Sequence, residues 1–148
     1  MLSGQQKNLL RYDFLSYIII LLGFFYSLNF YTYIYDPHHH GLVFSNAIDL
    51  INGKIPYKEI FIQYGIFTTL FHAAVLKLFG QELYYINFST ILIYYITLVL
   101  LNISVKELTN GFFGFLASTL IILNHPIIWL PWSNYIAYFF FDISTHYI

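Results

Sequence analysis

An uncharged run of 22 residues, from Phe14 to Tyr35, constrains this chain more than any other feature. As an α-helix rising about 1.5 Å per residue it reaches about 33 Å, enough to cross a hydrocarbon core roughly 30 Å thick. The end of the run offers no small-residue cleavage site, so we expect a retained membrane span, not a signal peptide. Lys7 and Arg11 precede the run, and the positive-inside rule therefore predicts a cytoplasmic N-terminus.

The composition agrees with a membrane protein and excludes several other classes. Of 148 residues, 59% are hydrophobic and only 9% are charged, whereas a soluble domain has about a quarter of its residues charged. A net charge of -1 argues against a nucleic-acid partner, because phosphate binding requires a basic surface. The sequence has no cysteine, which excludes disulfides, thiolate metal sites and cysteine nucleophiles.

Further apolar runs predict additional membrane helices after the first span, at about 14–35. We expect complete spans at about 83–103 and 111–130, and an incomplete span at 135–148. The sequence thus predicts an all-α, polytopic transmembrane helical protein with interfacial juxtamembrane helices in its first extracytoplasmic loop. Residues 1–148 form a single membrane domain, and we expect it to be the N-terminal part of a longer polypeptide.

The segment Ile66–Phe79 is apolar but short, and it decides the topology. Its 14 residues reach only about 21 Å as a helix, so we interpret it as an interfacial or half-inserted helix. If it does not cross the membrane, Lys106 lies in the cytoplasm and Pro131–Asn134 returns to the face that carries Asp36. If it does cross, that assignment is inverted.

The loop 36–65 between the first span and this segment is the longest polar stretch. Within it, apolar residues recur at helical spacing over 41–52, which predicts an amphipathic helix that Gly53 and Pro56 would terminate. A helix with one apolar face directly after a span is expected to lie flat on the bilayer surface, and Phe44 and Ile48 would then contact lipid.

The candidate chemistry lies at the start of this loop, in the run Asp36-Pro37-His38-His39-His40. Asp36 alone could simply cap the amphipathic helix, and the three histidines could be solvated interfacial residues. A divalent metal would require the carboxylate and the imidazoles to converge on one ion. We expect no metal and no other cofactor.

The order of these features resembles a known family. A first span is followed by Asp36 at its outer end, by the helix Gly41–Asn52, and by the segments Gly53–Glu59, Gln63–Gly65 and Leu78–Glu82. This order is similar to the N-terminal part of polytopic glycosyltransferases of the C-type fold, which include protein mannosyltransferases, the aminoarabinose transferase of lipid A and Rgt-like lipopolysaccharide transferases. The resemblance covers most of residues 14 to 135.

The resemblance implies transfer of a sugar from a polyprenyl-phosphate carrier to an extracytoplasmic glycan or glycolipid, in a bacterial inner (plasma) membrane. It also implies that Asp36 is the catalytic carboxylate. Many relatives carry Lys-Pro or His-Pro-Pro before the juxtamembrane helix, where this chain has Gln63-Tyr64-Gly65. The residues that we expect to contact the substrate are therefore His38, His39, His40, Lys54, Tyr57, Lys58, Gln63 and Tyr64.

The chemistry can also be argued without the resemblance. A hydroxyl that attacks an anomeric carbon needs a carboxylate to accept its proton, and the departing phosphate needs cationic or hydrogen-bonding partners. Asp36 could supply the first, and Lys54, Lys58 or the histidines the second.

A membrane transporter or a non-catalytic membrane subunit remains an alternative. In a transporter, ionisable groups are expected within the membrane, and the candidates here are His72, Lys77, His125 and Asp142.

Overall fold

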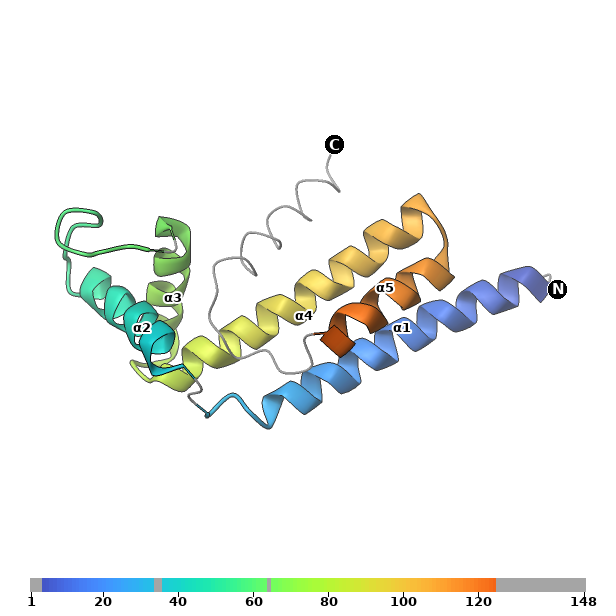
Figure 1. Cartoon of the computed structure of the whole chain (residues 1–148), viewed down its shortest axis with the longest axis horizontal. Helices are drawn as coiled ribbons and strands as arrows, with labels where there is room; N and C mark the ends of the chain where they lie inside the picture. Colours follow the sequence, from blue (N-terminus) through green and yellow to red (C-terminus); the bar gives the residue numbers. More distant parts are fainter. Residues whose placement is uncertain (1–3, 34–35, 64, 125–148) are drawn as a thin grey trace.

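The computed structural model describes residues 4–33, 36–63 and 65–124, and within these ranges the chain is helical without a β-strand. Helices α1 (Gly4–Leu28), α4 (Leu83–Leu108) and α5 (Gly111–Asn124) pack against one another as a long bundle. Helices α2 (Pro37–Ile51) and α3 (Ile66–Phe79) pack together at the end of the bundle where α4 begins (Figure 1). The expected all-α architecture is confirmed.

Two of these helices are long and apolar enough to cross a membrane. They are α1, over Arg11–Leu28, and the whole of α4, whereas α3 and α5 are apolar but shorter. By length and composition, the described part of the chain therefore has two candidate membrane-spanning helices.

The first span was predicted at about 14–35, but the helix that carries it begins earlier and does not reach residue 35. Helix α1 begins at Gly4, so Lys7 and Arg11 lie within it, and it ends at Leu28. The reason is Asn29, whose side-chain amide donates to the carbonyl oxygens of Phe25 (3.0 Å) and Tyr26 (3.1 Å). Asparagine competes in this way for backbone groups and tightens the last turn, which ends the helix although the following residues remain uncharged.

The amphipathic helix was predicted at 41–52, but α2 begins earlier, at Pro37. Asp36 caps the helix, and proline suits its first turn because that position needs no N–H donor. After Ile51 the chain turns at Gly53, which has a φ of 84°, as the glycine there predicted.

The other predicted helices differ less from the structure. The helical bounds predicted for 66–79 are confirmed by α3, which lies between Gly65 and Gly80. The end predicted for the span at 83–103 is too early, since α4 continues to Leu108. The hydroxyl of Ser104 donates to the carbonyl of Leu100 at 3.1 Å, so this polar residue fits within the helix. Of the span at 111–130, α5 covers the part to Asn124; residues 125–130 and the incomplete span at 135–148 lie outside the described residues.

Two polar contacts join α1 and α4 in antiparallel orientation. In the first half of α1, Asp13 Oδ2 lies 2.5 Å from Lys106 Nζ near the end of α4. Near the end of α1, the hydroxyls of Ser27 and Tyr95 are hydrogen-bonded at 2.9 Å. The buried core between these contacts is apolar and aromatic, with Ile20, Ile91, Tyr94, Tyr95 and Leu98. If α1 crosses a membrane, α4 therefore returns, and the loop between them lies on one face.

The apolar face of α2 packs on α3 and α4, so the expectation that it lies on lipid is wrong. Val43 and Ala47 are buried with Leu76 of α3 and Ile86 of α4. Phe44 and Ile48, which were expected to contact the bilayer, also pack against this cluster. Helix α3 offers an apolar surface directly beside α2, and burying α2 against it removes the same area from water.

Helix α3 buries Leu76 together with several polar residues, and it leaves most of its other large apolar residues exposed. Thr68, Thr69 and His72 are buried, whereas 74% of Phe67 and 77% of Leu78 are exposed. A contiguous exposed apolar surface of this kind is typical of lipid or protein contact. In a chain with candidate spans beside it, this surface favours contact of α3 with the bilayer.

Candidate functional site around Asp36

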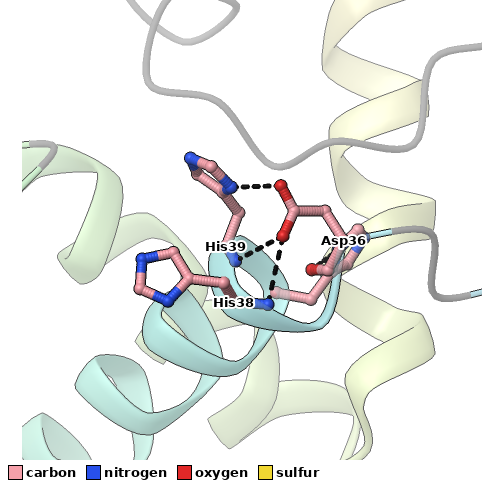
Figure 2. Close-up of polar contacts among 4 residues, drawn as sticks. Asp36, His38 and His39 are labelled. Carbon is pink, nitrogen blue, oxygen red and sulfur yellow. Dashed lines mark hydrogen bonds and ion pairs between the residues drawn. The ribbon is translucent and has the colours of Figure 1, made fainter.

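Asp36 lies at the junction between the α1–α2 linker and α2, and its carboxylate caps the helix. One carboxylate oxygen, Oδ1, accepts hydrogen bonds from the backbone N–H groups of His38 and His39, both at 3.1 Å. The other oxygen, Oδ2, contacts Nδ1 of the His39 ring (Figure 2). Asp36 therefore caps α2, as the sequence allowed, and its carboxylate also forms a pair with His39.

This environment keeps Asp36 ionised. The backbone N–H of His39 is the main cause that lowers the pKa of the Asp36 carboxyl below its ordinary value of 3.8. The hydrogen bond and charge of the His39 side chain add to the decrease, and desolvation acts in the opposite direction. Asp36 is thus an anion at neutral pH, placed where the α2 dipole favours negative charge.

The three histidines have different environments, although the sequence treats them alike. His40 is fully buried, and its Nδ1 donates to the Asp36 carbonyl at 2.8 Å. His38 is exposed, His39 is half-buried, and their ring centroids lie 5.4 Å apart. The ring of His40 packs inside the protein, which argues against the expected contact with substrate. His38 and His39 lie where a ligand could reach them.

The structure does not bring the expected lysines to Asp36. Lys54, Tyr57 and Lys58 follow the C-terminal end of α2, and Asp36 precedes its N-terminal end. A helix of 15 residues separates these ends by about 22 Å at about 1.5 Å per residue. Lys54 Nζ is moreover paired with Asp49 Oδ1 at 2.7 Å. The length of α2 and the ion pair with Asp49 therefore argue against a small site shared by Lys54 and Asp36.

The two remaining expected contacts lie just before α3. Gln63 is exposed at the end of the same loop, and Tyr64 lies outside the described residues. The loop is folded back on α2 by the buried amide of Asn46, which donates to the carbonyl of Phe61 at 2.9 Å. Gln63 therefore lies in the same loop as Lys54 and Lys58, which follows α2, whereas Asp36 precedes α2.

Sequence reasoning missed one residue that holds the segment before Asp36. The side-chain amide of Asn87, in α4, donates to the backbone carbonyls of Tyr31 (2.9 Å) and Tyr33 (3.3 Å) in the linker. The sequence contains one indication of this contact, since Asn87 stands inside an otherwise apolar span. A buried side-chain amide in such a helix needs hydrogen-bond partners.

A groove of about 390 Å³ runs between α3 and α4. It is walled by aromatic and aliphatic side chains from both helices: Phe71, Val75, Phe79, Tyr85, Phe88, Leu92, Ile93 and Ile96. Ser89, which also lines the groove, donates its hydroxyl to the Ile86 carbonyl at 2.9 Å. The groove therefore suits a hydrocarbon chain better than a polar ligand.

His72, a candidate proton carrier under the transporter alternative, is fully enclosed in α3. It is 1% exposed, and within the described ranges neither of its ring nitrogens has a hydrogen-bond partner. Burial lowers the pKa of its imidazole to about 3, so it is neutral at physiological pH. This environment does not favour proton uptake. Lys77 is exposed in the last turn of α3, and His125 and Asp142 lie outside the described residues.

Over residues 4–33, 36–63 and 65–124, no group of three or more His, Asp or Glu side chains is arranged to hold a metal ion. In this described part of the chain, Asp36 and His39 form a pair that is not extended to a group of three.

Comparison of the chain with profiles of protein families, with curated proteins and with solved structures found no match. The assignment of function rests on the geometry around Asp36.

Proposed function

We propose that this chain is the catalytic membrane part of a glycosyltransferase, which moves a sugar from a polyprenyl phosphate to a hydroxyl of an extracytoplasmic glycan or glycolipid. The observation that carries the proposal is the Asp36–His39 pair, set on the first turn of α2 directly after a linker from a candidate membrane-spanning helix. We place the protein in a bacterial inner membrane, with a cytoplasmic N-terminus and Asp36 on the opposite face.

The pair provides the proton acceptor that the reaction needs. The acceptor hydroxyl attacks the anomeric carbon, the bond from that carbon to the phosphate oxygen breaks, and polyprenyl phosphate leaves with the electron pair. The hydroxyl proton passes to the Asp36–His39 pair as the new bond forms. Asp36 is already ionised and in contact with His39, so an imidazolium formed during the reaction is stabilised by an adjacent carboxylate.

The phosphate contacts are assigned to the histidines in preference to the lysines. His38 is exposed on the same turn as the Asp36–His39 pair, whereas Lys54 and Lys58 follow the far end of α2. An imidazole N–H can donate to a phosphate oxygen and stabilise its developing charge. We therefore assign His38 to the leaving phosphate.

The lipid part of the donor would occupy the apolar surfaces of α3 and α4. The groove between these helices has walls that suit a prenyl chain, and the outer face of α3 exposes large apolar side chains beside it. The first residues of α4 also pack against α2, and α2 lies at the end of the bundle where α4 begins (Figure 1). This arrangement is compatible with a sugar headgroup at Asp36 and a lipid chain along α4.

The test is turnover of a polyprenyl-phosphate sugar by the full-length protein in membranes. Asp36→Asn keeps the shape of the side chain but removes the charge that makes the Asp36–His39 pair a proton acceptor, so turnover should fall by about 10² to 10⁴-fold. Asp49→Asn is the matched control, because Asp49 lies on the same helix in an ion pair with Lys54, and such surface pairs contribute little.

A purely capping role for Asp36 makes a different prediction. The loss would then appear as less folded protein, and the turnover per folded molecule of Asp36→Asn would equal that of Asp49→Asn. That result would remove the reason for calling Asp36 catalytic.

A further inference from the structure

We infer that Asn87 is a positioning residue: it fixes the linker before Asp36 and thereby the position of the Asp36 carboxylate relative to α4. The role of Asn87 in turnover rests on the function proposed above. Asn87 lies in the second turn of α4 and is 1% exposed. Its amide holds the carbonyls of Tyr31 and Tyr33, at 2.9 and 3.3 Å, across 56 and 54 residues of sequence.

The Tyr31 ring is held by the neighbours of Asn87 on the same helix. The rings of Tyr84 and Phe88 meet it edge to face, with centroids 6.1 and 6.2 Å away. Edge-to-face contacts at this distance are favourable for aromatic pairs. Tyr31 is thus fixed both by its carbonyl and by its side chain, although it lies beyond the end of α1.

The residue next to Asn87 fixes the other side of Asp36. Ile86 is fully buried in the cluster formed by α2 and α3, where it packs with Val43 and Ala47 of α2. Two consecutive residues of α4 therefore hold the chain before Asp36 and the helix after it. Asp36 lies between these two anchored segments, Tyr31–Tyr33 before it and α2 after it.

The chain contains a matched control for this role. Asn102 also lies in α4, is also 1% exposed, and donates its side-chain amide to a buried partner, Ser118 Oγ of α5, at 3.0 Å. It lies 15 residues further along the helix, about 22 Å from Asn87 at about 1.5 Å per residue. Removing either amide leaves similar damage to packing, but only Asn87 contacts the linker to Asp36.

The first measurement is kinetic and uses the full-length protein. Asn87→Ala should lower kcat for a polyprenyl-phosphate sugar by about 10 to 100-fold with little change in KM, because a displaced catalytic group affects turnover more than binding. Asn102→Ala, normalised to folded protein, should keep the parent kcat. Asn87→Asp, which keeps the size of the side chain, serves if Asn87→Ala does not fold.

The second measurement does not depend on the proposed function. The chain has no cysteine, so a nitroxide can be placed at Thr32, an exposed linker residue between Tyr31 and Tyr33. Its electron paramagnetic resonance spectrum should show increased mobility in the Asn87 variant and no change in the Asn102 variant.

The outcomes separate the two proposals. Unchanged mobility in the Asn87 variant would overturn the inference, and so would increased mobility with a parental kcat. Increased mobility in a protein whose parent turns over no polyprenyl-phosphate sugar would reject the proposed function and retain Asn87 as the residue that fixes the linker.

Discussion

Replacing Gly114 by alanine should weaken the packing of α5 on α4. Gly114 is buried in α5, and a Cβ built on it would lie 3.1 Å from Asn102 Nδ2 and 3.2 Å from the carbonyl oxygen of Asn102. The amide can rotate away, but only by leaving its hydrogen bond to Ser118. The carbonyl belongs to the α4 backbone and moves only with the helix, so the two helices must separate by a few tenths of an ångström.

The magnitude follows from two opposing terms. Overpacking of a well-packed contact costs about 1 to 3 kcal/mol, while glycine to alanine in a helix is favourable by about 1 kcal/mol. Gly114→Ala should therefore lower the free energy of unfolding by roughly 0 to 2 kcal/mol. Gly41→Ala in α2 isolates the second term, because a Cβ there meets nothing within 4 Å.

Both free energies can be measured by reversible denaturation of the protein in detergent micelles. The Gly114 variant should be less stable than the Gly41 variant by about 1 to 3 kcal/mol, which is the steric term alone. Equal stabilisation by the two substitutions would show that α4 and α5 do not approach closely at Gly114, and the reasoning would fail.

Two further predictions concern α2 and its packing. The pKa of the Asp36 carboxyl is lowered in the folded chain, so its contribution to the stability of α2 is present above pH 3.8, its ordinary value, and is lost as the pH falls through the lowered pKa. Hydrogen exchange of the first turn of α2 should therefore increase in that low pH range. Asp36→Asn should abolish this pH dependence. Leu76→Ala should cost about 2 to 5 kcal/mol, because Leu76 is 1% exposed, and Leu78→Ala, at a site 77% exposed, should cost far less in the same micelle assay.

The helical architecture could be predicted because it depends on local composition, and the helix ends could not where side chains decided them. The glycines on both sides of 66–79 marked α3 correctly. The end of α1 was missed because a single side chain, Asn29, closes the helix within an uncharged run. The packing of Phe44 and Ile48 was missed because the sequence pattern of an apolar face does not distinguish contact with lipid from contact with another helix.

The candidate site was predictable only in part. The start of the site, Asp36 with His38 and His39, is contiguous in sequence, so its gathering follows from one helical turn. His40 is one residue further and turns inward, which a run of identical residues cannot reveal. Asn87 was missed because its contacts span more than 50 residues and depend on how α4 packs beside the linker.

The pairing of Asp13 with Lys106 has a consequence for the time course of assembly. The two residues are 93 positions apart, and at a synthesis rate of about 5 to 20 residues per second Lys106 is made about 5 to 20 s after Asp13. Throughout that interval α1 carries a carboxylate whose partner has not been synthesised. The bundle can therefore be completed only once the end of α4 has left the ribosome. Until then α1 must be held in place without the ion pair between Asp13 and Lys106.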